Sequence, residues 1–207
     1  VIASNGPAII GSLAMVLLAA YICYIVHAVV VYSIAVKAMG GLSPLEFFKG
    51  MLPAIMFAFS SASSVGTLPI NMECVEKMGA SKEVTSFVLP LGATINMDGT
   101  SIMQGVAVIF IAQAYGIDLT PSALATVVAT ATVASIGTAG VPSVGLVTLS
   151  MVLTSVGLPT EGIALIMGID RILDMLRTAV NITGDAVCTT IIARQQGAFK
   201  KEVFDAD

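Results

Sequence analysis

The sequence predicts an all-α integral membrane protein with interrupted transmembrane helices and two re-entrant helical hairpins. Of its 207 residues, 57% are hydrophobic and 11% are charged, and the mean hydropathy is +0.97. A soluble domain carries about 25% charged residues, so the composition indicates a membrane protein. Five hydrophobic segments follow one another, and three of them are interrupted near their centres by polar or glycine-rich residues. Irregular backbone at membrane depth is tolerated only where it is buried or lines a cavity.

The first two segments differ in continuity. Residues 7–38 predict a transmembrane helix, because the only ionisable side chain from Ala8 to Val36 is His27 and about 20 apolar residues span a bilayer. His27 is the single histidine of the chain, so we expect it to donate a hydrogen bond between helices and not to bind a metal. Residues 45–78 are broken by a serine-rich run at 60–69, which a uniform spanning helix would not carry at its centre.

The later segments are interrupted in similar ways. Residues 84–116 predict a transmembrane helix broken at 96–100, and residues 119–159 predict a second broken stretch. Residues 162–194 predict a last transmembrane helix before the tail at 195–207. Both broken stretches contain Ser-x-Gly-Thr followed by proline, and each precedes a helix with polar residues at mid-depth. This pattern indicates a weak internal repeat of hairpin and polar helix.

The placement of lysine and arginine predicts the topology. If both broken stretches enter the membrane and return, seven basic residues lie on one face, while the loops at 117–121 and 158–161 contain none. The positive-inside rule places the basic face in the cytoplasm. We therefore expect a multi-pass protein of the cell inner (plasma) membrane, with a cytoplasmic C-terminus and hairpins that enter from opposite sides.

The last predicted helix carries a stripe of polar side chains. At 100° per residue, six of them fall within an arc of about 100°. They are Asp170, Asp174, Arg177, Thr178, Asn181 and Asp185. An ionisable group that faces lipid costs at least ~2.5 kcal/mol, so the stripe must face protein, water or a ligand. Arg177 suits a carboxylate and Asp174 suits an ammonium group, although the two could also neutralise each other.

A second group of polar residues suits a cation. Asn96, Asp98, Asn181 and Asp185 offer oxygen ligands without a cluster of histidine or cysteine, which favours sodium over a transition metal. Interhelical hydrogen bonding and proton carriage are the alternatives. An ion channel remains open as a different class, whereas no catalytic pattern surrounds the single histidine and we expect no enzyme. The net charge of −4 includes acids inside apolar stretches and indicates no nucleic-acid partner.

Four ordered motifs, covering nearly the whole chain, resemble the dicarboxylate/amino acid:cation symporter family of glutamate transporter homologues. They are the serine-rich run before 66–69, Asn-Met-Asp-Gly-Thr at 96–100, Gly-Thr-Ala-Gly-Val-Pro at 137–142, and Asp-x-x-Arg-Thr-x-x-Asn-x-x-x-Asp at 174–185. The resemblance implies the C-terminal part of an inverted-repeat transport domain that symports glutamate or aspartate with sodium by an elevator-type mechanism. Proton-coupled symport of these substrates, or of C4-dicarboxylates, is the alternative. The resemblance also implies a missing N-terminal scaffold that holds a homotrimer in the lipid bilayer.

The same resemblance implies roles for individual residues. Arg177 would bind the substrate side-chain carboxylate, Asp174 the amino group, and Thr178 with Asn181 the main-chain carboxylate. The other implied pocket residues are Ser63, Ser64, Thr100, Val141 and Gly145. Sodium is implied as the coupling ion, with no cofactor, at three sites: Gly92, Asn96, Asn181 and Asp185; Thr94, Met97, Ser135, Ile136 and Thr138; and Asn96 with Asp98. The second hairpin would be the outer gate.

One departure from familiar members concerns an arginine. Some members carry it at the first hairpin tip, where this chain has Ala62, whereas Arg171 lies beside Asp170 in the last helix. We expect Arg171 to reach that tip from the last helix and to support Asp174, unless it only packs at the helix edge.

Overall fold

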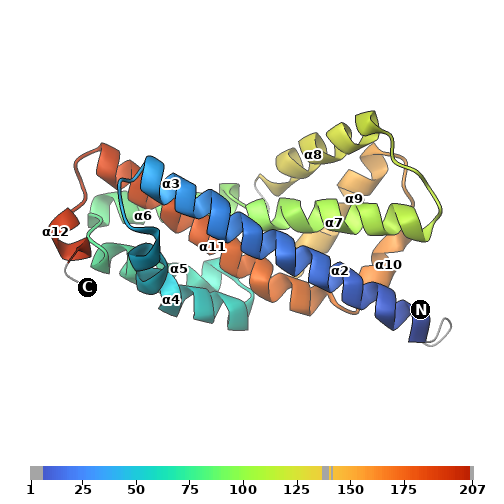
Figure 1. The fold of residues 1–207 in the computed structure, drawn as a ribbon, viewed down its shortest axis with the longest axis horizontal. Helices are drawn as coiled ribbons and strands as arrows, with labels where there is room; N and C mark the ends of the chain where they lie inside the picture. Colours follow the sequence, from blue (N-terminus) through green and yellow to red (C-terminus); the bar gives the residue numbers. More distant parts are fainter. Residues whose placement is uncertain (1–6, 137–139, 141, 206–207) are drawn as a thin grey trace.

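The structure is a computed structural model that describes residues 7–136, 140 and 142–205. In these residues all regular structure is helical, apart from an isolated antiparallel bridge between Ala80 and Phe199. The expectation of an all-α protein is therefore confirmed. The longest helices run roughly along the long axis of the molecule, with the N-terminus and the C-terminus at opposite ends (Figure 1).

The first long helix changes its geometry near its middle. α2 (Pro7–Val26) continues through the π-helical segment η1 (His27–Tyr32) into α3 (Ser33–Ala38). The stretch Ile10–Ala38 is long and apolar enough to cross a membrane. π-helical turns often occur at functional sites, and this one places two polar side chains, His27 and Tyr32, on the face that meets the rest of the protein.

The serine-rich run forms the turn of a helical hairpin. α4 (Pro44–Ser61) ends at Ala62, whose φ of 53° is left-handed, and α5 (Ser64–Lys77) begins directly afterwards. Ser63 caps α5, because its hydroxyl accepts a hydrogen bond from Gly66 N at 3.0 Å. Side chains that compete with helical hydrogen bonding therefore lie at the turn, where they satisfy the free N–H groups of a new helix.

The central segments continue this pattern. α6 (Lys82–Ile95) and α7 (Asp98–Ala114) are separated by Asn96 and Met97, whose backbone is not helical. Together, the two helices provide a second stretch, Lys82–Ala114, that is apolar and long enough to cross a membrane. α8 (Pro121–Ser135) and α9 (Val144–Ser155) pack against each other as a second hairpin.

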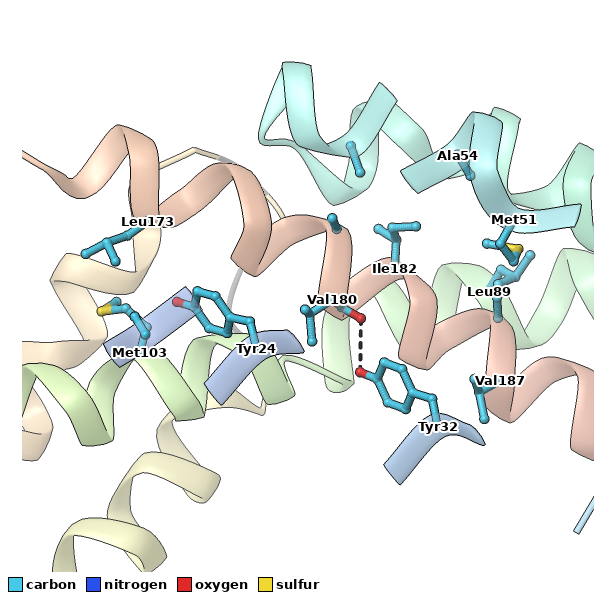
Figure 2. Close-up of a cluster of buried hydrophobic side chains, with 14 of the residues drawn as sticks. Tyr24, Tyr32, Met51, Ala54, Leu89, Met103, Leu173, Val180, Ile182 and Val187 are labelled. Carbon is cyan, nitrogen blue, oxygen red and sulfur yellow. Dashed lines mark hydrogen bonds between the residues drawn. The ribbon is translucent and has the colours of Figure 1, made fainter. Parts of the chain in front are cut away.

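The last long helix is central to the fold. η2 (Thr160–Gly162) and α10 (Ile163–Ile166) precede α11 (Asp170–Gln195), so the helix expected over 162–194 is broken before Asp170. α11 contacts α2, α4, α5, α6 and α7, and most of its side chains are buried. Figure 2 shows labelled side chains from α2, η1, α4, α6 and α7 beside those of α11. The Tyr32 hydroxyl donates to the Val180 carbonyl at 3.0 Å. The short α12 (Lys201–Phe204) follows.

The two hairpins approach the middle of the molecule from opposite ends (Figure 1). At one end, Arg194 Nε donates to Gly40 O at 3.0 Å and Lys200 N donates to Gly79 O at 2.8 Å. These contacts join the end of α11 to the connections before α4 and after α5. The first hairpin therefore begins and returns at the same end of the molecule.

Candidate functional site

The centre of the polar stripe on α11 is a buried ion pair. Arg177 Nη2 lies 2.7 Å from Asp174 Oδ1, and each side chain is only 2% exposed. Arg177 Nε and Thr178 Oγ1 donate to the same oxygen at 3.2 and 3.1 Å. The other oxygen, Oδ2, accepts from Ser143 N, at the start of the second hairpin's α9, at 2.7 Å. In this structure the two charges neutralise each other.

The guanidinium of Arg177 retains one unused donor. Among the described residues, its Nη1 has no hydrogen-bond partner. The backbone of Gly145 lies directly against it, and a Cβ added there would meet the guanidinium and come within 2.8 Å of Met103 Cε. A buried N–H without an acceptor is costly, so Nη1 offers a donor that an added carboxylate could satisfy.

Asn181 connects the stripe to the break between α6 and α7. Its Oδ1 accepts from Gly99 N at 2.8 Å, and its Nδ2 lies 3.3 Å from Thr100 Oγ1 and 3.1 Å from Met97 Sδ. Gly99 is required for this contact, because a Cβ there would lie 2.7 Å from Arg177 O. The Asn-Met-Asp-Gly-Thr motif is thus packed on α11 beside the ion pair.

The structure brings together the first predicted set of sodium ligands. Asn96 Nδ2 donates to Asp185 Oδ1 at 3.0 Å and lies 3.4 Å from Asn181 O. A Cβ added to Gly92 would lie 2.7 Å from Asp185 Oδ1, so the Gly92 backbone borders the same carboxylate. These carboxylate and carbonyl oxygens fit a hard cation, for which the Asn96 amide would have to yield its place on Asp185.

The third predicted set, Asn96 with Asp98, meets the first long helix. Asp98 Oδ2 lies 2.9 Å from His27 Nε2 and accepts from the Tyr32 hydroxyl. His27 therefore makes an interhelical hydrogen bond. Gly184 allows this convergence, because a Cβ there would lie 2.7 Å from both Asn96 Nδ2 and Tyr32 Oη. Tyr32 and Gly184 are not among the residues predicted from the sequence, because a regular α-helix would place Tyr32 on another face than His27 and the π-helical turn brings them together.

In the second predicted sodium set, the two described hydroxyl groups bond within their own helices. Thr94 Oγ1 donates to Leu91 O at 2.9 Å and Ser135 Oγ to Thr132 O at 2.8 Å, which are bonds within their own helices. Ile136 is 56% exposed. The other members predicted for the second hairpin tip, Thr138 of this set and Val141 of the substrate pocket, lie outside the described residues.

The tip of the first hairpin contacts the second hairpin and α11. Ser63 Oγ donates to Gly140 O at 3.2 Å, and Ser64 is buried beside the same glycine. Arg171 Nη2 and Nη1 donate to the carbonyls of Ser60 and Ser61 at 3.0 and 3.4 Å. Arg171 thus reaches the first tip from α11, and in the described residues it makes no hydrogen bond to Asp174.

Comparison with known proteins identifies similar sequences. The family model described as the sodium:dicarboxylate symporter family matches residues 1–195. Excitatory amino acid transporter 2 of Mus musculus is 51% identical over 151 residues, which cover 72% of this chain and 26% of the relative. Excitatory amino acid transporter 1 of Rattus norvegicus is 45% identical over 183 residues, covering 88% of this chain and 34% of the relative. The chain therefore spans about a third or less of these curated relatives.

Proposed function

The chain belongs to the sodium:dicarboxylate symporter family, and from this we propose that it forms part of a secondary active symporter of acidic amino acids, glutamate or aspartate, driven by sodium. The relatives described above are named as excitatory amino acid transporters, which supports this substrate class. The observation that carries the proposal is the buried Asp174–Arg177 pair with its unused Nη1.

The pair selects for a ligand that carries both charges. Opening a buried ion pair leaves two uncompensated charges, which is strongly unfavourable unless new partners replace the old ones. An acidic amino acid supplies both, with its side-chain carboxylate on Arg177 and its ammonium on Asp174. A simple dicarboxylate would leave Asp174 without a cation once the pair had opened. The site therefore favours amino acids over C4-dicarboxylates.

We assign the remaining substrate contacts to groups that surround the pair. Thr178 and Asn181 would bind the main-chain carboxylate, since both lie along α11 on the same buried face. The first tip, Thr100 and the backbone at Gly145 would complete the pocket, with Ser63, Ser64 and the undescribed Val141 as predicted members.

Sodium would bind next to the substrate and share groups with it. The set of Gly92, Asn96, Asn181 and Asp185 has the strongest support, because its members are already neighbours. Asn181 would belong to both sites, because its backbone carbonyl lies beside Asn96 of the cation set and its side chain contacts Thr100 of the substrate set. Ordering this residue for one ligand favours the other, which provides a physical basis for coupling.

We further infer that the two hairpins are re-entrant and that the second is the gate. The tips meet near the centre of the molecule, and Ser143 N must leave Asp174 before an ammonium can bind there. Opening of α8 and α9 would expose the pair, while the first hairpin stays attached to α11 through Arg171. An elevator-type movement, a cytoplasmic C-terminus and a homotrimer in the lipid bilayer remain predictions of this proposal.

Uptake of radiolabelled aspartate into proteoliposomes containing the full-length protein tests the proposal. We expect concentrative uptake with an inward sodium gradient, and inhibition by glutamate but only weak inhibition by succinate. Uptake that ignores sodium and follows a pH gradient instead would support proton coupling. Flux that neither saturates nor becomes concentrative would support a channel.

A further inference from the structure

A buried glutamine joins α7 to the second hairpin. Gln104 is fully buried, and its Nε2 donates to Thr148 Oγ1 in α9 at 2.6 Å. Thr148 Oγ1 in turn donates to Gly145 O at 3.2 Å. The backbone of Gly145 lies against the guanidinium of Arg177, so the two hydrogen bonds connect α7 to the glycine that covers Arg177.

The environment of Gln104 does not favour a polar residue for stability alone. Its Oε1 has no hydrogen-bond partner among the described residues. The neighbouring core positions on α7, Met103, Ala107 and Val108, are apolar and buried. An unpaired buried acceptor destabilises the fold, whereas an apolar side chain of similar size would avoid that cost. The amide is therefore better explained by the bond that it makes to Thr148.

Two of the hydrogen bonds that hold the second hairpin near the ion pair differ in how a ligand would affect them. One is the bond from Ser143 N to Asp174 Oδ2, which an incoming ammonium group would replace. The other is the bond from Gln104 to Thr148, which joins two uncharged side chains and involves neither Asp174 nor Arg177. A ligand bound to that pair would therefore leave this second bond in place.

We propose that Gln104 is a positioning residue that latches α9 through Thr148 and so keeps Gly145 over Arg177 while substrate is bound; this inference rests on the proposed transport function. Loss of the latch shifts the second hairpin toward its open state, and apparent affinity falls in proportion to the population of the closed state. Because the latch opposes opening, its loss accelerates substrate release and does not slow the transport cycle.

Kinetics of aspartate uptake by the full-length protein test the latch. Gln104→Leu and Thr148→Val should each raise KM roughly three- to tenfold, the effect of one net hydrogen bond, without lowering the maximal rate. The double variant should resemble either single variant, because both break the same bond. Thr148→Ser keeps the hydroxyl and should retain the original KM. Gln113→Leu, at an exposed glutamine on the same helix, is the matched control.

Hydrogen–deuterium exchange gives a second readout that does not depend on substrate identity. In substrate-free protein, exchange across residues 144–155 should be faster in Gln104→Leu and Thr148→Val than in Thr148→Ser. An unchanged KM, effects that multiply in the double variant, or unchanged exchange would overturn the latch. If the unmodified protein transported no acidic amino acid, the proposed function would be wrong, and hydrogen–deuterium exchange would still test the latch. If Gln104→Leu failed to fold, the comparison of Thr148→Val with Thr148→Ser would decide.

Discussion

Ser63 and Gly140 join the tips of the two helical hairpins: the Ser63 hydroxyl donates to the Gly140 carbonyl at 3.2 Å. A second bond from Val65 N reaches the same carbonyl at 3.3 Å. The Gly140 carbonyl thus accepts both hydrogen bonds from the start of α5. Gly140 lies three residues before Ser143, whose N–H donates to Asp174 of the ion pair. In the proposed gating, these tips separate to admit substrate.

Gly140→Ala should weaken the contact between the tips. A Cβ at this position would lie 3.0 Å from Ser64 Cβ and 3.1 Å from Val65 Cγ2, closer than the tips can accommodate without moving apart. We expect the apparent affinity for aspartate to fall roughly five- to tenfold, equivalent to about 1 to 1.4 kcal/mol, and substrate to dissociate faster in a filter-binding assay. Gly105→Ala is the control, because no neighbouring atom lies within 4 Å of its added Cβ. Equal affinity in the two variants would contradict a closed contact between the tips.

Arg177→Thr should remove the binding of acidic amino acids. The substitution deletes the partner of Asp174, which then retains, among the described residues, the Thr178 hydroxyl and the Ser143 N–H as donors. Breaking a buried pair on one side typically costs about 3–5 kcal/mol, so stability should also fall. A ligand ammonium can restore a counter-charge for Asp174, and a neutral amino acid is expected to bind and to raise the melting temperature of the variant. Undiminished affinity for aspartate would refute the assignment of Arg177 to the side-chain carboxylate.

Asp185→Asn should weaken sodium binding and leave the substrate pocket in place. Asp185 is buried and contacts Asn96 and the Gly92 backbone, whereas the Asp174–Arg177 pair does not involve it. The sodium concentration for half-maximal uptake should rise on the order of 10- to 100-fold, the range seen when groups that support a metal ligand are lost. At saturating sodium, aspartate affinity should recover. A loss of substrate binding at every sodium concentration would show that Asp185 belongs to the substrate site instead.

Much of the site could be predicted because its residues share a helix face. The spacing of Asp174, Arg177, Thr178 and Asn181 places them on one side of α11, and the structure buries all four. The polar interruptions are likewise visible in the sequence, because serine at a helix N-cap and glycine at a helix break have local physical causes. These features depend on neighbours a few residues apart.

The remaining features depend on contacts between distant segments. Ser143 binds Asp174 through a backbone N–H, which every residue except proline carries and which has no sequence signature. Gly184 is required by the approach of Asn96 and Tyr32, and the break before Asp170 falls in a stretch without proline, with Gly168 as its one local hint. The i, i+3 spacing allows Asp174 and Arg177 either to pair with each other or to bind separate groups of a ligand, and the structure shows them paired.

The C-terminal tail provides a last prediction, which concerns stability. Lys200 N donates to Gly79 O at 2.8 Å. Phe199 is buried, and its ring centroid lies 5.7 Å from Arg194 Cζ. Gly79 has a φ of 109°, and a Cβ there would lie 2.5 Å from Lys200 O. Gly79→Ala should therefore detach the tail and release the backbone at the exposed Lys200 and Lys201, so that trypsin cleaves after these residues at least severalfold faster than in the Gly105→Ala control. Because the tail joins α11 to the base of the first hairpin, the melting temperature should fall by several degrees, consistent with the loss of roughly 1–3 kcal/mol of packing. Unchanged cleavage and melting would show that the tail does not hold this end together.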